Sequence, residues 1–330
     1  MGVWVSVCMI TYNHEKFITE AIEGVLMQET VFEYELVIAN DNSFDNTDKI
    51  IQEFITIHPK GHRIRYFKQE KNIGMMPNAL FALAQSKGKF IALCEGDDYW
   101  IDKNKLQKQV DFLEQNPDFS ICFHDVYTLF ENSNKKEYTA NTEREILTIE
   151  DLAKWNFINT PSCVFKNQII EFPSWFKDCP AGDYALHLLN AQYGKIKRIP
   201  EAMAVYRVHD GGVWSMKDRM YILSKWIPMV EKLKHQFNSN LVICFEEHLT
   251  PIYHEYIELL STNFDTQIVG NEVLEVSISS EYFVENIKKL KLNHLKQLEE
   301  VQIKLILTKN YIKKNKLKSI IKIIIGRDLI

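Results

Sequence analysis

The chain has 330 residues, of which 46% are hydrophobic and 25% charged, and its formal net charge is −5. This composition is ordinary for a globular protein and excludes a disordered chain. No apolar run approaches about 18 residues and the N-terminus lacks a basic export signal, so we expect a cytoplasmic protein without a spanning helix. The six cysteines are scattered and lack metal-finger spacing, which favours reduced thiols in the core.

The first third of the chain alternates short apolar runs with segments of helical periodicity. Strands that alternate with helices of about ten residues predict right-handed crossovers and a mainly parallel sheet covered on both faces. The predicted fold class is therefore α/β. Strands are expected at 3–10, 35–39, 63–67 and 90–94, and helices at 15–27, from the capping residues 45–47 to 57, at 78–85 and at 105–114.

The pattern changes after residue 115. Apolar segments at 119–130, 162–165 and 196–208 and a helix at 183–193 predict further strands and one more crossover. The polar segment 131–145 is predicted to be a loop or lid. From about residue 217 the pattern is helical with few turn signals. We therefore expect one domain at 1–215 and a helical C-terminal region at 216–330.

The apolar run at 90–94 ends abruptly in three carboxylates, Glu95, Asp97 and Asp98. Ligands of open α/β sheets bind beyond the carboxyl ends of the strands, so these acids are expected at a ligand site. Their oxygens suit a hard divalent cation, Mn²⁺ or Mg²⁺, which would bind a diphosphate. The alternative is an acidic turn with a permissive backbone at Gly96. The chain lacks both GxGxxG and GxxxxGK[ST] motifs, which disfavours dehydrogenases and P-loop kinases.

Polar residues follow the other strands as well, in an ordered set of motifs. Together these motifs resemble the family-2 glycosyltransferases with the GT-A fold, of the bacterial polysaccharide or glycoconjugate type. The resemblance covers residues 3–215 and does not extend to the rest of the chain. The matching segments are VSVCMITYN at 5–13, ANDNSFDNT at 39–47, NIG at 72–74, CEGDDYW at 94–100, GDY at 182–184 and YRVHDGGVWS at 206–215.

The resemblance implies a nucleotide-sugar-binding domain in which residues 1–100 bind the donor and residues 101–215 handle the acceptor. The implied reaction moves a hexose or N-acetylhexosamine from a nucleoside diphosphate, with UDP implied, to a hydroxyl of a glycan or lipid-linked glycan, with inversion. Asp183 matches the family's catalytic base. The DxD motif falls on Glu95-Gly96-Asp97, so Glu replaces its first Asp, and Asp97 is the implied metal ligand. Nucleotide contacts are implied for Ile10, Thr11, Tyr12, Asp41, Asn72, Glu95 and Gly96.

Chemical reasoning supports several of these roles, each beside a structural alternative. An inverting displacement needs one carboxylate to take the acceptor proton, and Asp183 either does this or caps the helix that follows it. His209 is expected to complete the metal shell or to form a structural hydrogen bond. Arg207 is expected to bind the diphosphate or to pair with acids. Trp214 and Ser215, after a Gly-Gly pair, are expected to form a lid that excludes water, unless the pair is an ordinary turn.

The C-terminal end differs in charge from the rest. Residues 286–330 hold 12 Lys and Arg against 3 Asp and Glu. Within 300–330, Lys alternates with Ile and Leu, which predicts a basic amphipathic helix that docks peripherally on the anionic inner face of the cell membrane. The alternative is a helix packed on its own domain or on a second subunit of a homo-oligomer. Few aromatic residues accompany the Lys, so no nucleic-acid partner is expected.

Two other functions compete with glycosyl transfer. A sugar-phosphate nucleotidyltransferase would also use an acid-bound metal at the edge of an α/β sheet. Such an enzyme usually needs a Gly-rich basic loop after its first strand, and TYNH at 11–14 is not one. A non-catalytic module that binds glycans or nucleotides is disfavoured because Asp97, Asp183 and His209 are all present. Transfer of a sugar is therefore the preferred prediction.

Overall fold

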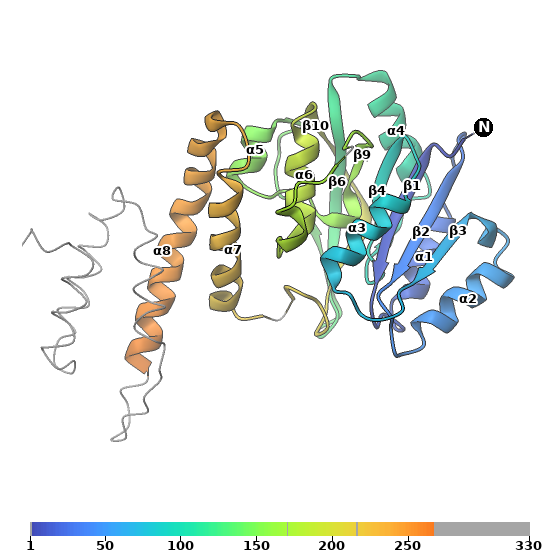
Figure 1. Cartoon of the computed structure of the whole chain (residues 1–330), viewed down its shortest axis with the longest axis horizontal. Helices are drawn as coiled ribbons and strands as arrows, with labels where there is room; N and C mark the ends of the chain where they lie inside the picture. Colours follow the sequence, from blue (N-terminus) through green and yellow to red (C-terminus); the bar gives the residue numbers. More distant parts are fainter. Residues whose placement is uncertain (1, 170, 216, 267–330) are drawn as a thin grey trace, which may run out of the picture. The chain divides into compact units, whose positions relative to one another are not determined.

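The computed structural model describes residues 2–169, 171–215 and 217–266. Within them, ten strands form one sheet in the order β3-β2-β1-β4-β9-β6-β10-β5, with β7 paired to β6 and β8 to β10 (Figure 1). The strands are β1 (Val5–Thr11), β2 (Tyr34–Asn40), β3 (Ile64–Lys68), β4 (Phe90–Leu93), β5 (Tyr99–Trp100), β6 (Phe119–Phe130), β7 (Lys135–Thr139), β8 (Ile146–Leu147), β9 (Val164–Lys166) and β10 (Lys195–Val208). The helices are α1 (Ile18–Leu26), α2 (Thr47–Ile57), α3 (Met75–Gln85), α4 (Lys105–Gln115), α5 (Ile149–Lys154), α6 (Gly182–Ala191), α7 (Arg219–Leu233) and α8 (Val242–Thr266).

The sheet is mixed and mostly parallel, which confirms the predicted α/β class. Strand β1 pairs in parallel with β2 and β4, β2 with β3, and β6 with β10. Strand β9 lies between β4 and β6 and is antiparallel to both. The prediction for 131–145 was wrong in part, because β7 lies within this segment and pairs antiparallel with β6. Its side chains are largely exposed, so its polar composition concealed a strand.

Alternation along the central strands divides their side chains between two faces of the sheet. Val5, Val7 and Met9 of β1 belong to the main hydrophobic core, together with the apolar side of α1. Cys8 therefore points to the opposite face, against which α3 packs. In the parallel register of β1 and β4, Leu93 is the partner of Cys8 and lies on the same face. This second face forms the floor of a cavity.

The chain continues beyond the sheet into α7 and α8, so the predicted helical region is present as far as the structure describes it. Residues 1–254 form one compact unit and residues 255–330 a second. This division lies further along the chain than the boundary expected at 215, and the donor and acceptor halves stay predictions. All six cysteines are free and buried. No helix in the described part of the chain is long and apolar enough to cross a membrane. The predicted basic tail at 300–330 lies outside the described residues.

Candidate active site

The acidic loop after β4 is held against the end of β1 by backbone hydrogen bonds. The Cys94 N–H donates to the Cys8 carbonyl at 3.2 Å, and the Gly96 N–H donates to the Ile10 carbonyl at 2.9 Å. A Cβ at Gly96 would lie only 2.6 Å from the Thr11 hydroxyl oxygen. The loop can therefore approach the first strand this closely because residue 96 has no side chain.

Three carboxylates gather in this loop. Glu95, Asp97 and Asp98 each offer an oxygen, and these atoms lie within 4.8 Å of one another. Within the described residues, Asp97 Oδ1 and Asp98 Oδ2 are buried and have no hydrogen-bond partner. Burial and the charge of Asp97 raise the pKa values of Glu95 and Asp98 well above their usual range. Crowded carboxylates with unpartnered buried oxygens are suited to a divalent cation.

Two imidazoles face Asp97. His209 Nε2 lies 3.0 Å from Asp97 Oδ2, and His14 Nε2 lies 3.8 Å from the same oxygen. Burial raises the pKa of Asp97, but the His209 hydrogen bond and the charges of both histidines more than offset it, so this pKa is lowered. Burial also lowers the pKa of His14, despite the nearby Asp97 carboxylate. Asp97 is thus the most readily ionised of the three acids.

Arg207 organises the same loop from β10. Its backbone N–H donates to Asp98 Oδ1 at 2.8 Å, and its Nε donates to the Asp97 carbonyl at 2.7 Å. The rest of its guanidinium pairs with the carboxylates of Glu20 and Glu131. The side chain of Arg207 is 5% exposed, so this geometry corresponds to the acid-pairing alternative. A contact between Arg207 and a diphosphate stays a prediction.

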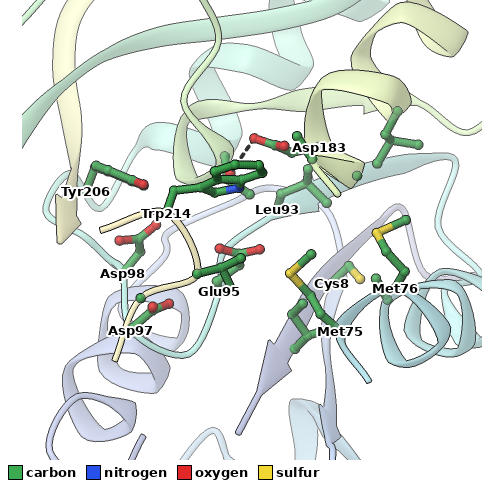
Figure 2. A pocket seen from close by; sticks show the side chains of 18 of the residues that line it. Cys8, Met75, Met76, Leu93, Glu95, Asp97, Asp98, Asp183, Tyr206 and Trp214 are labelled. Carbon is green, nitrogen blue, oxygen red and sulfur yellow. Dashed lines mark hydrogen bonds between the residues drawn. The ribbon is translucent and has the colours of Figure 1, made fainter. Parts of the chain in front are cut away.

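Asp183 lies in the first turn of α6. The helix begins at Gly182 with Ala181 in the N-cap position, so Asp183 is not the helix cap. Its Oδ2 accepts a hydrogen bond from the Thr160 hydroxyl at 3.1 Å. Asp183, Glu95 and Asp97 line one cavity (Figure 2). The acid proposed as base and the acidic loop therefore face a common space.

The segment after β10 forms another wall of this cavity. Trp214 and Ser215, the residues predicted to form a lid, line it. The Trp214 indole lies between Asp98 and Asp183 in the view of Figure 2. The indole packs edge-on against Trp226 of α7, with ring centroids 6.1 Å apart. Closure of this segment over a ligand stays a prediction.

Some of the residues implied in nucleotide binding line the cavity, and the others lie outside it. Ile10 and Glu95 line the cavity. The Asp41 carboxylate accepts the N–H groups of Ile73 and Gly74 at 2.7 and 2.9 Å, so it shapes the loop before α3. The remaining expected residues do not line the cavity, and their base and ribose contacts stay predictions. These residues are the buried Thr11 and Asp41, the exposed Tyr12 and Asn72, and Gly96, which contacts the β1 loop.

Sequence reasoning missed several residues of the site. His14 was assigned no role, although it faces Asp97. Met75 and Met76 line the cavity from the start of α3, and Tyr206 lines it from β10. The available signal was weak: a His directly after the TYN segment, and two methionines directly after Gly74.

The mixed α/β sheet and its acidic strand end define a protein of the GT-A type. A model of the family described as "Glycosyl transferase family 2" matches residues 6–175. The chain belongs to this family.

Proteins of other organisms are similar to part of this chain. An uncharacterized protein of Mycobacterium tuberculosis is 40% identical over 214 residues, which cover 63% of this chain and 60% of that protein. An uncharacterized glycosyltransferase of Methanocaldococcus jannaschii is 30% identical over 205 residues, covering 56% of this chain and 67% of its own. The chain thus spans about 60% of the length of the mycobacterial relative.

Two solved structures share the fold at low sequence identity. Residues 1–349 of S. aureus TarS with UDP-GlcNAc superpose with a TM-score of 0.57 at 17% identity, covering 75% of this chain and 72% of that one. The mannosyltransferase PcManGT of Pyrobaculum calidifontis with GDP-Man and Mn²⁺ gives a TM-score of 0.56 at 16% identity, covering 78% and 75%. Both similarities support the fold alone.

Proposed function

We propose that the protein is a metal-dependent, inverting glycosyltransferase that moves a sugar from a nucleoside diphosphate to an acceptor hydroxyl. The single observation that carries this proposal is the cavity shared by Asp183 and the acidic loop. One carboxylate can take a proton from the acceptor only if it lies apart from the groups that stabilise the departing diphosphate. The bound nucleotide sugars in TarS and PcManGT support the same class of donor.

The acidic loop fits a divalent cation, Mn²⁺ or Mg²⁺. Asp97 would hold it through the unpartnered Oδ1, with Asp98 Oδ2 and Glu95 as the other nearby carboxylate donors. His209 is the proposed nitrogen ligand, and its contact with Asp97 Oδ2 keeps it beside the loop. When bound, the cation would supply the positive charge that a departing nucleoside diphosphate requires.

Protein groups would carry out the remaining work. Asp183 would accept the proton of the attacking hydroxyl, and the Thr160 hydrogen bond would hold its carboxylate in place. Trp214 and Ser215 would exclude water, which would otherwise hydrolyse the donor. Arg207 would position Asp97 and Asp98 through its backbone N–H and Nε.

A donor panel tests the proposal. UDP-, GDP- and dTDP-sugars are incubated with the full chain, Mn²⁺ and a panel of glycan and lipid-linked glycan acceptors, and release of the nucleoside diphosphate is followed. Asp183→Asn and Asp97→Asn are expected to lower this release at least about 100-fold. Asp178→Asn, an exposed acid just before α6, is the matched control and should retain activity. Absence of release with every donor, or full activity in Asp183→Asn, contradicts the proposal. If added pyrophosphate instead converts a donor to the nucleoside triphosphate and the sugar 1-phosphate, the enzyme is a nucleotidyltransferase.

The acceptor and location are proposed as well. The acceptor is a glycan or a lipid-linked glycan, and the basic segment at 300–330 would bring the enzyme to an anionic membrane surface. Sedimentation with anionic vesicles tests this part. If a chain that ends at residue 299 sediments as well as the full chain does, the membrane proposal is wrong.

A further inference from the structure

The cavity has two chemically different sides. Figure 2 shows Asp98, Tyr206 and Trp214 on one side of Glu95, and Cys8, Met75 and Met76 on the other. The polar side holds the acidic loop and the lid segment. The other side holds Cys8, Met75 and Met76. Together with the other apolar lining residues Leu83, Leu93 and Leu186, these are here called the apolar wall. The proposed function uses the acidic side and assigns no role to the apolar wall.

The apolar wall offers little to a sugar hydroxyl. Its methionine and leucine side chains carry no hydrogen-bond donor and no strong acceptor. The Cys8 thiol carries the one polar hydrogen of this wall. Burial, together with the charge of Glu95, raises the pKa of Cys8 to about 12. The thiol thus stays protonated and is a weak partner. A hydroxyl placed against this wall would lose its water without replacement, which is unfavourable.

The wall is also built close to the proposed base. A Cβ at Gly182 would lie 2.2 Å from the sulfur and 2.6 Å from the terminal carbon of Met76. Met76 therefore occupies the space that a side chain at residue 182 would need. Asp183 is the next residue, so the thioether packs against the same first turn of α6 that carries the proposed base. Asp183 and this wall line the same cavity, so a sugar bound there can contact both.

From these contacts we propose that the donor sugar carries a methyl group, which lodges against the apolar wall. The methyl group belongs either to a 6-deoxy sugar or to an N-acetyl substituent, since both present the same apolar surface. This inference rests on the proposed function and narrows its substrate class. Discrimination by one such group in an apolar pocket is worth roughly 10- to 200-fold in kcat/KM.

Matched donor pairs test the inference in the presence of Mn²⁺. UDP-glucose is compared with UDP-N-acetylglucosamine and with UDP-6-deoxyglucose, and GDP-mannose with GDP-6-deoxymannose. At least one methyl-bearing donor should exceed its hydroxyl counterpart about 10-fold or more in kcat/KM for nucleotide release. The pair that shows the preference distinguishes the N-acetyl source from the 6-deoxy source. If every plain hexose donor is used as well as its counterpart, this inference is wrong and the proposed function stands. If no donor is bound or used, the proposed function itself fails.

A variant of the wall provides an independent measurement. Met75→Gln keeps the length of the side chain but places an amide in the wall, so the preference for the methyl-bearing donor should fall at least about threefold. Met27→Gln is the control, because Met27 is also half-buried but packs on the main core away from the cavity. Its donor preference should equal that of the wild type. Thermal unfolding checks that both variants are folded, and an unchanged preference in folded Met75→Gln overturns the inference.

Discussion

His187 makes the stability of the protein depend on pH. It lies on α6, one turn after Asp183, and it is 0% exposed. Neither ring nitrogen has a hydrogen-bond partner within the described residues. Burial lowers the pKa of His187 from 6.5 to about 4, although Asp183 opposes the shift. The folded protein therefore keeps this imidazole neutral at a pH where the unfolded chain protonates it.

The sign and size of the effect follow from this pKa difference. Between pH 6.5 and about 4 the unfolded state binds more protons at this residue, so the free energy of unfolding falls as the pH falls. At 1.36 kcal/mol per pKa unit the full loss is about 3 kcal/mol, of which about 2 kcal/mol appears between pH 7 and pH 5. The stabilisation is thus complete above the unfolded pKa and is lost below it.

Urea unfolding at about pH 7 and about pH 5 measures this loss. His187→Leu should reduce the pH-dependent loss by about 2 kcal/mol relative to the wild type, because leucine does not titrate. His62→Leu removes an exposed histidine and should keep the wild-type loss. If His187→Leu loses as much stability on acidification as the wild type does, the imidazole is not held neutral and the reasoning is refuted.

Three further substitutions test other parts of the structure. Trp226→Leu removes the ring against which Trp214 packs, so the donor Kd measured by calorimetry should rise about fivefold; an unchanged Kd contradicts this. Glu95→Gln relieves carboxylate crowding, so the Tm without metal should rise by about 2 °C or more. The increase in Tm that Mn²⁺ causes should become smaller. A metal-free Tm below that of the wild type would contradict this prediction. Asp125→Asn leaves the buried Arg198 without its charged partner. Urea unfolding should show that the free energy of unfolding falls by about 3–5 kcal/mol, and a fall of less than about 1 kcal/mol would contradict this prediction.

The sheet and the acidic loop could be predicted from the sequence because both depend on local patterns. A buried strand reads as a continuous apolar run, so the position of β4 and of the acids after it followed directly. Strand ends in a parallel sheet meet at one edge, which brought Glu95, Asp97 and the end of β1 together in the prediction. The structure agrees, since the Gly96 N–H donates to the Ile10 carbonyl.

Features that depend on packing between distant segments could not be predicted. The approach of Met76 to Gly182 joins residues more than 100 positions apart in the sequence. The position of His14 beside Asp97 follows from the loop after β1, where Asn13 adopts a positive φ of 57°. Such a φ is available to Asn, but the sequence does not indicate that it is used. Strand β7 was missed because its polar residues leave no apolar alternation to detect.

The acidic loop is expected to lower the stability of the fold when no metal is bound. Burial and mutual repulsion raise the pKa values of Glu95 and Asp98, and buried oxygens of Asp97 and Asp98 have no partner in the described part of the chain. A fold selected for stability alone would have polar or apolar residues of the same size here. Arg207 neutralises the cluster only in part, because its guanidinium is also paired with Glu20 and Glu131. In the proposed function, a divalent cation beside a diphosphate would supply this positive charge when the donor binds.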